Sequence, residues 1–345
     1  MQFKELPKLK KGDKVAIVSP STVAPAIWPS VYELGLKRVK EIFELEPVEM
    51  SYTKKLGATK EERAQDLIDA FSEKNLKAVI SSLGGDDQVT YIKNLPKDIF
   101  KDNPKPFFGF SDNTHFVNHL WLAGVPSYYG GSLFTQFATP ASMDEFTIKY
   151  LKHALFDNGE FELEQSKEFN DIDTSWNDES VLGIRREYEE NEGWYWDGEN
   201  SAEGILWGGC IESVDELLRH NITIPSLSDF ENIVLVLESS EEMPSSYYVK
   251  SVIRAFGERG ILSKIKGLLI GRPKAWSFDY QKIKEQKIEY KKEQRDIILK
   301  TAREYNKDIP IIQNMDFGHT APQICLPMGK AVRIDSKSQK IFANF

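Results

Sequence analysis

The sequence predicts an α/β fold with two domains: an N-terminal open, mostly parallel α/β sheet domain and a C-terminal mixed β-barrel-like/α domain. Three observations predict this fold. Short apolar, β-branched runs alternate with helix-like segments in the first half of the chain. An acidic stretch poor in aliphatic residues follows at residues 157–203, and short β-like runs punctuated by Gly and Pro come after it. A chain of 345 residues is also long enough for two domains.

The N-terminal half is a series of strand and helix pairs. Val15–Ser19 and Ala78–Ser82 are apolar runs bounded by Gly, Asp or Pro, which is typical of buried parallel strands. Phe107–Phe110 is a third such run, and it leads into a polar turn. Helices are expected at residues 31–44 and 61–73, where apolar and charged residues follow a helical pattern. Ligands of such a sheet bind at the carboxyl ends of its strands.

We predict three parts of the chain: an N-terminal domain at residues 1–160, a crossing segment with a Trp-rich loop at 161–203, and a C-terminal domain at 204–345. A loop as long as this crossing segment is usually either functional or disordered in a compact protein. The elements expected in the C-terminal domain are strands at 233–237, 267–270 and 331–334 and helices at 249–256 and 283–305.

Composition excludes several classes of partner. The 44 Lys and Arg against 53 Asp and Glu leave a net charge of -9, which disfavours binding of a nucleic-acid polymer. No apolar run approaches the roughly 18–20 residues of a membrane span, and the N-terminus lacks the apolar core of a signal peptide. Two cysteines, Cys210 and Cys325, are too few for a disulfide framework or a Cys-rich metal site. We therefore expect a cytoplasmic protein.

Ser111 is the first candidate for chemistry. An apolar strand delivers it into the turn Gly109-Phe110-Ser111-Asp112-Asn113-Thr114, and a helix follows. Strand, sharp turn and helix form the context of a nucleophile elbow, and the helix N-terminus could stabilise a developing oxyanion. The turn lacks the second glycine of G-x-S-x-G, so a helix N-cap formed by Ser111 or Asp112 is the structural alternative.

A turn that contains Gly84, Gly85 and Asp86 follows the strand predicted at Ala78–Ser82. Two glycines allow the backbone to turn its N–H groups toward a ligand. One donor from this turn and one from Asp112 would form an oxyanion hole with two donors. A plain strand-to-helix turn is the structural alternative.

Glu238 is the candidate acid. It ends the apolar run Leu235-Val236-Leu237, and a carboxylate there is costly to bury unless it is paired or hydrogen-bonded. This placement makes Glu238 a better candidate than the more exposed-looking Glu241 and Glu242. A salt-bridged strand end is the structural alternative.

His319 is the candidate base, because it alone of the five histidines lies in a Gly-flanked loop, Met315-Asp316-Phe317-Gly318-His319-Thr320. His115 and His119 are four residues apart on the helix after Ser111, a spacing that can hold a metal. There is no intervening Glu and no third ligand, so we expect these two histidines to have structural roles.

The ordered segments GFSDNT, SSLGGDD, LVLESSEE and FGHT resemble the LD-carboxypeptidase family of serine peptidases. GILWGGCIESV, PSSYYVKSVIRAF and IKGLLIGRP are similar to the branch that contains the microcin C immunity peptidase. The resemblance runs from about Gly12 to Ile334. It implies an N-terminal open α/β domain, a C-terminal barrel-like domain, a homodimer, and no metal or organic cofactor.

The resemblance also implies roles for individual residues. Ser111 matches the nucleophile, Glu238 the triad acid and His319 the general base of this family. The backbone amides of Gly85, Asp86 and Asp112 match its oxyanion hole. Cys210 stands where many relatives have Asn, so hydrogen bonding at this turn is expected to differ.

Two substrates fit this resemblance. The first is a peptidyl- or aminoacyl-nucleotide conjugate of the microcin C type, for which Trp194 and Trp196 could form a stacking surface. The alternative is a murein tetrapeptide from which an LD-carboxypeptidase releases D-alanine during peptidoglycan recycling. Packing against the C-terminal domain is the structural alternative for the two tryptophans. A catalytically silent binding protein and an α/β-hydrolase esterase remain as less favoured functions.

Overall fold

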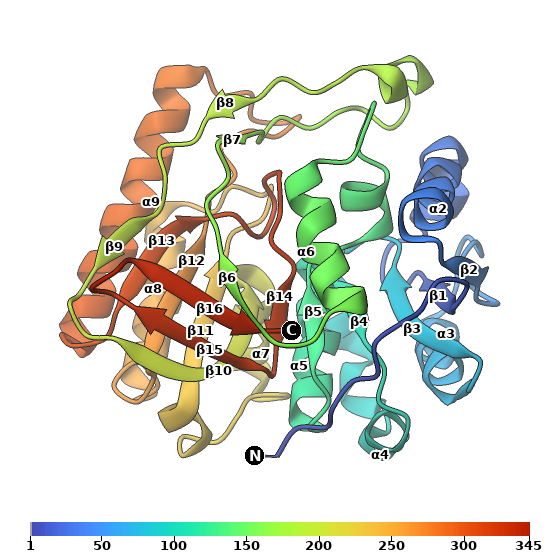
Figure 1. Cartoon of the computed structure of the whole chain (residues 1–345). Coiled ribbons are helices and arrows are strands. Elements are labelled where there is room, and N and C mark those ends of the chain that lie inside the picture. The colour runs from blue at the N-terminus through green and yellow to red at the C-terminus, as the bar shows by residue number, and fades with distance from the viewer. Residues whose placement is uncertain (1) are drawn as a thin grey trace.

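The computed structural model describes residues 2–345, which form two large sheets side by side (Figure 1). The first sheet has six strands in the order β14-β5-β4-β3-β1-β2. These strands are β1 (Lys14–Val18), β2 (Glu46–Glu49), β3 (Leu76–Ser81), β4 (Phe107–Gly109), β5 (Ser127–Tyr129) and β14 (Leu326–Met328). Strands β1 to β5 pair in parallel, and β14 joins β5 in antiparallel orientation.

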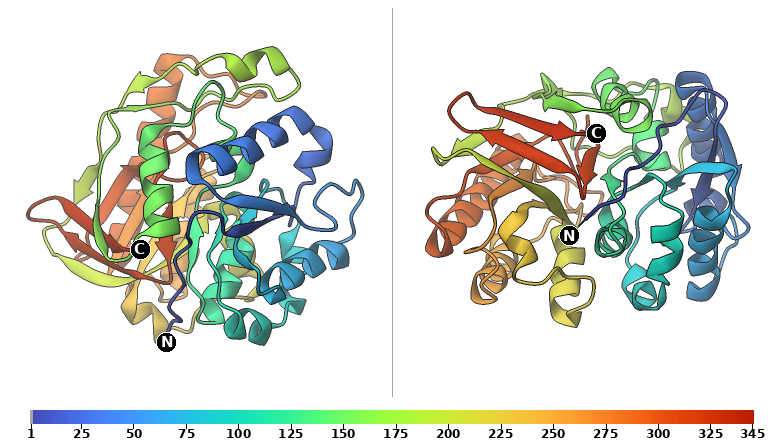
Figure 2. Two further views of the ribbon diagram at one scale, coloured as in Figure 1. Left: turned by 45° about the vertical axis from the view of Figure 1, so that its right-hand side comes forward. Right: turned by 60° about the horizontal axis from the view of Figure 1, so that its bottom comes forward.

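Helices cover both faces of the first sheet, as expected for an open α/β sheet (Figure 2). The helices α2 and α6 lie on one side, and α3, α4 and α5 lie on the other. Their bounds are α2 (Pro29–Phe43), α3 (Lys60–Ser72), α4 (Lys97–Asp102), α5 (Thr114–Leu122) and α6 (Glu145–Phe156), with the short α1 (Ala24–Ile27) before α2.

The N-terminus of α3 shows how the local sequence determines where a helix begins. It starts with a capping box in which Thr59 and Glu62 each accept a hydrogen bond from the other's backbone N–H.

The second sheet has eight strands in the order β6-β16-β15-β10-β11-β12-β13-β9. The strands are β6 (Glu160–Leu163), β9 (Tyr195–Asp197), β10 (Ala202–Cys210), β11 (Ile233–Glu238), β12 (Gly267–Gly271), β13 (Ile311–Met315), β15 (Ala331–Asp335) and β16 (Lys340–Asn344). Its central strands β10 to β13 are parallel and its outer strands antiparallel. Its helices are α7 (Ile211–His220), α8 (Ser246–Glu258) and α9 (Lys284–Tyr305). The predicted two-domain α/β fold class is confirmed.

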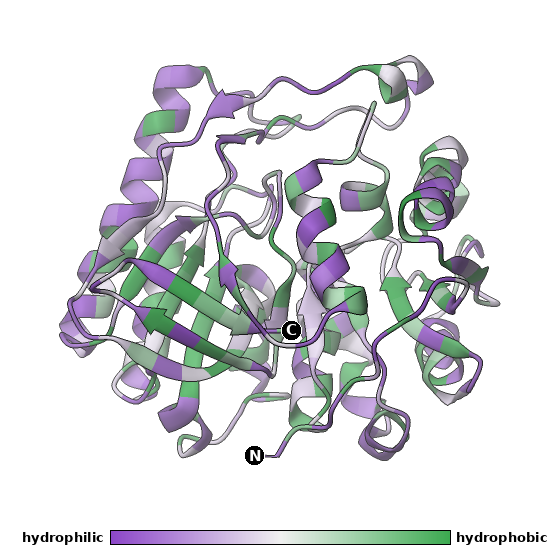
Figure 3. Ribbon diagram, in the orientation of Figure 1, coloured by the Kyte–Doolittle hydropathy of each residue, from purple (hydrophilic) through white to green (hydrophobic). Residues whose placement is uncertain are grey.

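Apolar residues concentrate in the strands of both sheets, while polar residues cover the outside of α9 (Figure 3). Strand β11 is buried at each of its positions, as a central parallel strand must be. None of the helices within residues 2–345 is both long and apolar enough to cross a bilayer.

The segment predicted as a crossing loop contains regular structure. It holds β6, β9 and a small two-stranded sheet of β7 (Glu168–Phe169) and β8 (Glu189–Glu190). Residue Asn170 also pairs with Ala321 in an isolated bridge, so this segment lies beside the loop that follows Gly318-His319. The proposed domain boundaries at 160 and 204 stay a prediction.

The two sheets meet through α5 and β10. The indole N–H of Trp121 donates to the carbonyl of Leu206 at 3.0 Å, and the Asn118 amide donates to the carbonyl of Gly208 at 3.1 Å. Gly209 has a φ of 142°, and a Cβ at this position would collide with Thr114. The close approach at Gly209 brings the carboxyl end of β4 near the carboxyl end of β11.

Candidate active site

Ser111 lies directly beyond the carboxyl end of β4 in a strained turn. Its φ is 63°, in the left-handed region that non-glycine residues seldom adopt, and such strain is typical of functional turns. The backbone N–H of Ser111 donates to the Tyr129 hydroxyl at 3.2 Å. Gly84 lies against the turn, since a Cβ there would be 3.1 Å from the Ser111 Oγ. The turn therefore presents the serine hydroxyl at the edge of the sheet, with the Gly84–Gly85 turn beside it.

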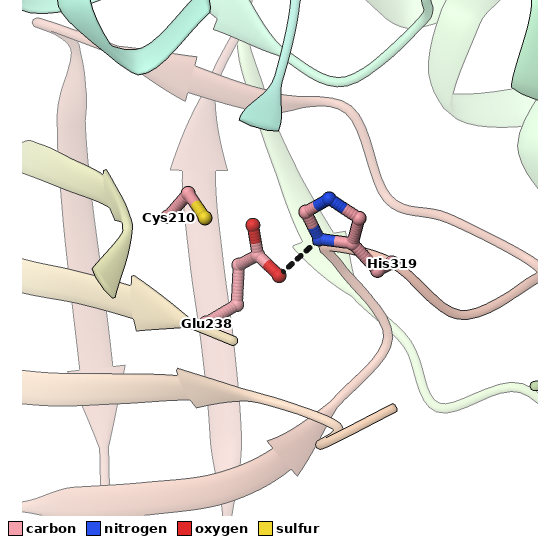
Figure 4. Close-up of side chains that lie close together, drawn as sticks. All are labelled: Cys210, Glu238 and His319. Carbon is pink, nitrogen blue, oxygen red and sulfur yellow. Dashed lines mark hydrogen bonds and ion pairs between the residues drawn. The ribbon is translucent and has the colours of Figure 1, made fainter. Parts of the chain in front are cut away.

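Glu238 and His319 form a hydrogen-bonded pair at the carboxyl end of β11 (Figure 4). The Glu238 Oε2 atom lies 2.7 Å from His319 Nδ1, and Glu238 is only 2% exposed. Gly318 makes this approach possible, because its φ is 93° and a Cβ at this position would collide with the Glu238 carboxylate. A buried carboxylate on one ring nitrogen fixes the tautomer and the orientation of the imidazole.

Tyr129, at the end of β5, connects the two sides of the site. Its hydroxyl donates to Glu238 Oε1 at 2.6 Å while accepting the N–H of Ser111. Burial, together with the charge of Glu238, raises the pKa of Tyr129 well above its usual value, so the hydroxyl stays a donor. One tyrosine thus joins the turn of Ser111 in the first sheet to the acid of the second. Sequence reasoning missed Tyr129, although its place at a strand end before Gly130 could have indicated it.

The other nitrogen of the His319 ring faces a second carboxylate. Nε2 lies 3.2 Å from Glu241 Oε2, and no hydrogen bond joins Ser111 Oγ to the imidazole within residues 2–345. Burial lowers the pKa of His319, but the charges of Glu238 and Glu241 outweigh it and raise the pKa to about 9. The imidazole is therefore charged at neutral pH in this conformation.

The predicted oxyanion-hole residues surround Ser111. Gly85, Asp86 and Asp112 line the same cavity as Ser111. Gly85 has a φ of 153°, and a Cβ there would collide with Ser21, so the position requires glycine. In the part of the chain that the structure describes, the backbone N–H groups of Gly85 and Asp86 donate to no protein acceptor. They are available to a ligand.

A cavity of about 600 Å³ opens beside Ser111 and His319. Its lining includes the aromatic side chains of Trp28, Phe110, Phe134, Trp176 and Phe278. Trp28 and Trp176 meet edge to face, with ring centroids 4.9 Å apart. Arg186 and Lys274 also line this cavity; Lys274 pairs with Asp173, another lining residue, and Arg186 pairs with Asp144 at 3.7 Å. The aromatic walls therefore suit a ligand with a planar part.

Trp194 and Trp196, the tryptophans singled out from the sequence, lie elsewhere. Trp194 is 8% exposed, belongs to the main hydrophobic core, and donates its indole N–H to Asp316 at 2.9 Å. Neither residue is among those that line the large cavity within residues 2–345. Trp176, in the same crossing segment, faces the cavity instead. A single tryptophan in a polar stretch carries no periodic signal, so the sequence did not distinguish it.

Cys210, Glu238 and His319 offer ligand atoms within 4.8 Å of one another (Figure 4). The Cys210 thiol donates to Glu212 Oε2 at 3.0 Å. Burial, with Glu212 and Glu238, raises the pKa of Cys210 well above its usual value, so sulfur stays protonated. Both carboxylate oxygens of Glu238 already accept hydrogen bonds. A protonated thiol and an occupied carboxylate do not favour a metal ion here.

Two family models match the chain and together span more than half of it. The LD-carboxypeptidase N-terminal domain matches residues 15–130, and the LD-carboxypeptidase C-terminal domain matches residues 203–334. The chain belongs to the LD-carboxypeptidase family. It is therefore a peptidase, a hydrolase of peptide-type amide bonds.

Individual members of this family resemble the chain over most of its length. The inferred carboxypeptidase YocD of Bacillus subtilis is 28% identical over 335 residues, which are 96% of this chain and 96% of YocD. The microcin C7 self-immunity protein MccF of Escherichia coli is 23% identical over 83% of this chain and 78% of its own length. The crystal structure of an MccF-like protein from Streptococcus pneumoniae in complex with AMP matches with a TM-score of 0.83 at 26% identity. That match covers 96% of this chain and 98% of the other.

Proposed function

We propose that Ser111, His319 and Glu238 form a catalytic triad that hydrolyses an amide bond. The observation that carries this proposal is the hydrogen-bond chain Ser111–Tyr129–Glu238–His319, which crosses both sheets. His319 Nε2 takes the proton of the Ser111 hydroxyl while Oγ forms a bond to the amide carbonyl carbon. Glu238 holds Nδ1–H and stabilises the imidazolium that forms.

The second half of the reaction uses the same groups. The imidazolium returns its proton to the amide nitrogen, the C–N bond breaks, and an acyl ester remains on Ser111. A water molecule loses a proton to His319 and attacks the ester carbonyl carbon. The C–O bond to Ser111 then breaks, the imidazolium returns its proton to Ser111 Oγ, and the carboxylic acid leaves. Backbone N–H groups of Gly85, Asp86 and Asp112 bind the oxyanion in both steps. Each donor contributes roughly 3 kcal/mol of transition-state stabilisation.

Substrate entry must change the partner of His319. In the structure Nε2 faces Glu241, whereas the mechanism requires it to face the Ser111 hydroxyl. The half-exposed Glu241 carboxylate can turn into solvent, because 51% of its side-chain surface is already accessible. Catalytic hydrogen bonds commonly tighten only when substrate is bound.

We propose peptidyl- or aminoacyl-nucleotide conjugates as the substrates. The cavity beside Ser111 supports this choice, since the indole of Trp176 offers a stacking surface for a planar base. Lys274, which pairs with Asp173 in the same cavity, would have to exchange this partner to contact a phosphoryl or sulfamoyl group. The AMP complex of the S. pneumoniae relative, whose chain this protein matches nearly throughout, supports a nucleotide in this family's fold. Trp176 then takes the stacking role first assigned to Trp194 and Trp196.

A side-by-side hydrolysis assay tests this function. Purified protein is given an aminoacyl-sulfamoyl-adenosine or an L,D-linked murein tetrapeptide, with Ser111→Ala as the blank. We expect cleavage of the adenosine conjugate and none by Ser111→Ala. Selective release of D-alanine from the tetrapeptide would instead assign the enzyme to peptidoglycan recycling. Equal turnover by Ser111→Ala would remove Ser111 as the nucleophile.

We also propose that the enzyme is a cytoplasmic homodimer with the two domains divided at residues 160 and 204. Its two cysteines, Cys210 and Cys325, are both free and buried, which suits a reducing compartment. The homodimer rests on the family resemblance, and the domain division rests on the acidic stretch at residues 157–203. Light scattering of the purified protein tests the dimer, and limited proteolysis tests the boundaries.

A further inference from the structure

The carboxyl ends of three neighbouring parallel strands, β11, β12 and β13, meet at one edge of the second sheet. Glu238 is the last residue of β11, Arg272 directly follows β12, and Asp316 directly follows β13. We call residues 316–320 the His319 loop. Arg272 therefore lies between the strand that carries the acid of the proposed triad and the loop that carries its base.

Arg272 and Asp316 form an ion pair that is closed to solvent. The side chain of Arg272 is 1% exposed and that of Asp316 is 0% exposed. The NH2 group of the guanidinium donates to Asp316 Oδ1 at 2.5 Å. Because the desolvation of two buried charges offsets most of their attraction, a pair of this kind adds little to stability compared with an apolar pair. Its place beside the His319 loop indicates a role in arranging that loop.

The same guanidinium binds the other end of the loop. Its NH1 group donates to Thr320 Oγ1 at 3.2 Å. Asp316 lies three residues before His319, and Thr320 lies one residue after it. One planar group with its donors in a fixed geometry thus holds the His319 loop on both sides of the imidazole.

Asp316 is held in turn by the crossing segment. Its Oδ2 atom accepts the indole N–H of Trp194 at 2.9 Å and the backbone N–H of Ser166 at 3.1 Å. Its Oδ1 atom also accepts the Ser166 hydroxyl at 2.5 Å. The guanidinium carbon of Arg272 lies 4.7 Å from the ring centroid of Phe169 in the same segment. The ion pair cannot shift without breaking these contacts, so it is a rigid support for the His319 loop.

The His319 loop must be placed accurately. Nδ1 of His319 lies 2.7 Å from Glu238 Oε2. A Cβ at Gly318 or at Gly271 would collide with the Glu238 side chain, so the backbone of both segments packs directly against the acid. A displacement of about 1 Å would stretch the hydrogen bond at Nδ1, and misplacement on that scale can reduce a rate by about a hundredfold.

We propose that Arg272 is a positioning residue for the hydrolysis: it fixes the His319 loop at both ends and so holds the imidazole against Glu238. This inference rests on the proposed function. Within residues 2–345, Arg272 is not among the residues that line the cavity beside Ser111. Its route to the reacting atoms is the His319 loop, so its substitution should change kcat more than KM.

Steady-state kinetics of Arg272→Lys test the effect on rate, with whichever substrate the wild-type enzyme cleaves, the aminoacyl-sulfamoyl-adenosine or the murein tetrapeptide. Lysine keeps a charge opposite Asp316 but has no planar fork that reaches Thr320 as well. We expect kcat to fall about tenfold to a hundredfold with little change in KM. Lys105→Met is the control for lost stability, since the buried Lys105 donates to two backbone carbonyls at the end of α3. It should lower the free energy of unfolding and leave kcat unchanged.

Thr320→Val is a milder variant, because it removes one hydroxyl and leaves the ion pair intact. Thr320→Ser keeps the hydroxyl and is its matched control. We expect kcat to fall several fold in Thr320→Val and to stay near the wild-type value in Thr320→Ser. Thr320 also lines the cavity beside Ser111, so kcat rather than KM is the constant to compare.

Proton NMR reports the placement of His319 without any substrate. At neutral pH the imidazole is charged, and the Nδ1 proton bound to Glu238 gives a resonance far downfield, which His319→Ala identifies by its absence. The buried ring of His115, which contacts Glu216 at 3.0 Å, gives a second resonance that serves as an internal control. We expect Arg272→Lys to shift or broaden the His319 resonance and to leave that of His115 unchanged.

The outcomes separate this inference from the proposed function. A wild-type kcat or an unchanged His319 resonance in Arg272→Lys would overturn the positioning role and leave the hydrolysis at Ser111 standing. If the wild-type enzyme cleaves neither substrate, the proposed function fails and the resonance alone decides: a changed resonance supports the positioning of His319, and an unchanged one overturns it. If Arg272→Lys also loses the His115 resonance, it has not folded, and Thr320→Val is judged by the same two criteria.

Discussion

His319 Nε2 lies 3.2 Å from Glu241 Oε2, while Nδ1 of the same ring lies 2.7 Å from Glu238 Oε2. One imidazole is therefore held between two carboxylates, and the nitrogen that must accept the serine proton is engaged by the second. This arrangement opposes the first step of the proposed mechanism, because a protonated His319 cannot act as a base. The consequence is a measurable dependence of activity on pH.

We expect kcat/KM to rise with pH until about pH 9, where His319 loses its proton in the free enzyme. Glu241→Gln removes one of the two charges that raise the pKa of His319, so the midpoint should move to lower pH and activity at pH 7 should increase. Stopped assays from about pH 5.5 to about pH 10, in steps of about half a pH unit, measure the midpoint of this rise in activity. Glu242→Gln changes a neighbouring carboxylate that does not pair with His319, and it should leave the midpoint in place. An unchanged midpoint in Glu241→Gln would show that Glu241 does not control the base.

Two substitutions of Ser111 distinguish the catalytic role of its hydroxyl from the strain of its backbone. Ser111→Ala and Ser111→Gly should both abolish turnover, since both remove the hydroxyl. The φ of 63° is strained for alanine and free for glycine. We expect Ser111→Gly to have a free energy of unfolding about 1 kcal/mol higher than that of Ser111→Ala. Urea denaturation of the two variants measures the difference, and a less stable Ser111→Gly would contradict the strained turn.

Tyr129→Phe removes the hydroxyl that links Ser111 N–H to Glu238 Oε1. Because both partners are left unsatisfied in a buried site, we expect a loss of about 1–3 kcal/mol in the free energy of unfolding and a lower kcat. Tyr128→Phe, at the neighbouring position, is the matched control, since the Tyr128 hydroxyl contacts Lys8 and lies outside this network. Wild-type kcat in Tyr129→Phe would show that the network does not position the triad.

Glu238→Gln keeps the shape of the acid and removes its charge. The amide cannot stabilise an imidazolium, and it can present a donor to Nδ1, which favours the wrong tautomer of His319. We expect a loss of several orders of magnitude in kcat with little change in KM. Steady-state kinetics on one conjugate measure both constants. A greater loss in Glu241→Gln than in Glu238→Gln would reassign the acid to Glu241.

Substitution of Trp176 should weaken ligand binding, whereas substitution of Trp194 should lower the stability of the fold. Trp176→Ala should weaken binding of a nucleotide conjugate by about 1–3 kcal/mol through lost stacking, with little effect on unfolding. Trp194→Ala should lower the free energy of unfolding by roughly 3–5 kcal/mol, because it removes a core indole that donates to the buried Asp316. Calorimetric binding to Ser111→Ala and thermal unfolding provide the two readouts. Loss of nucleotide affinity in Trp194→Ala alone would return the stacking role to Trp194.

The sequence by itself determined the local elements that carry the chemistry. The apolar run before Ser111 and the apolar run ending at Glu238 form β4 and β11, because buried parallel strands need continuous apolar residues. The order of short motifs was enough to predict the family, which the family models confirm. These features depend on neighbours within a few residues, so the linear pattern contains them.

Tertiary structure alone decided which side chains meet. Tyr129 is 109 residues from Glu238, and the Glu241 carboxylate reaches His319 from a different loop. Trp176, rather than Trp194, lines the cavity, whereas Trp194 packs in the core and donates its indole N–H to Asp316. Contacts of this kind depend on how two sheets pack across α5 and β10, and no local periodicity encodes that packing. Glu212, Asp215 and Glu216 of α7 likewise lie beside Ser111 only because of the fold.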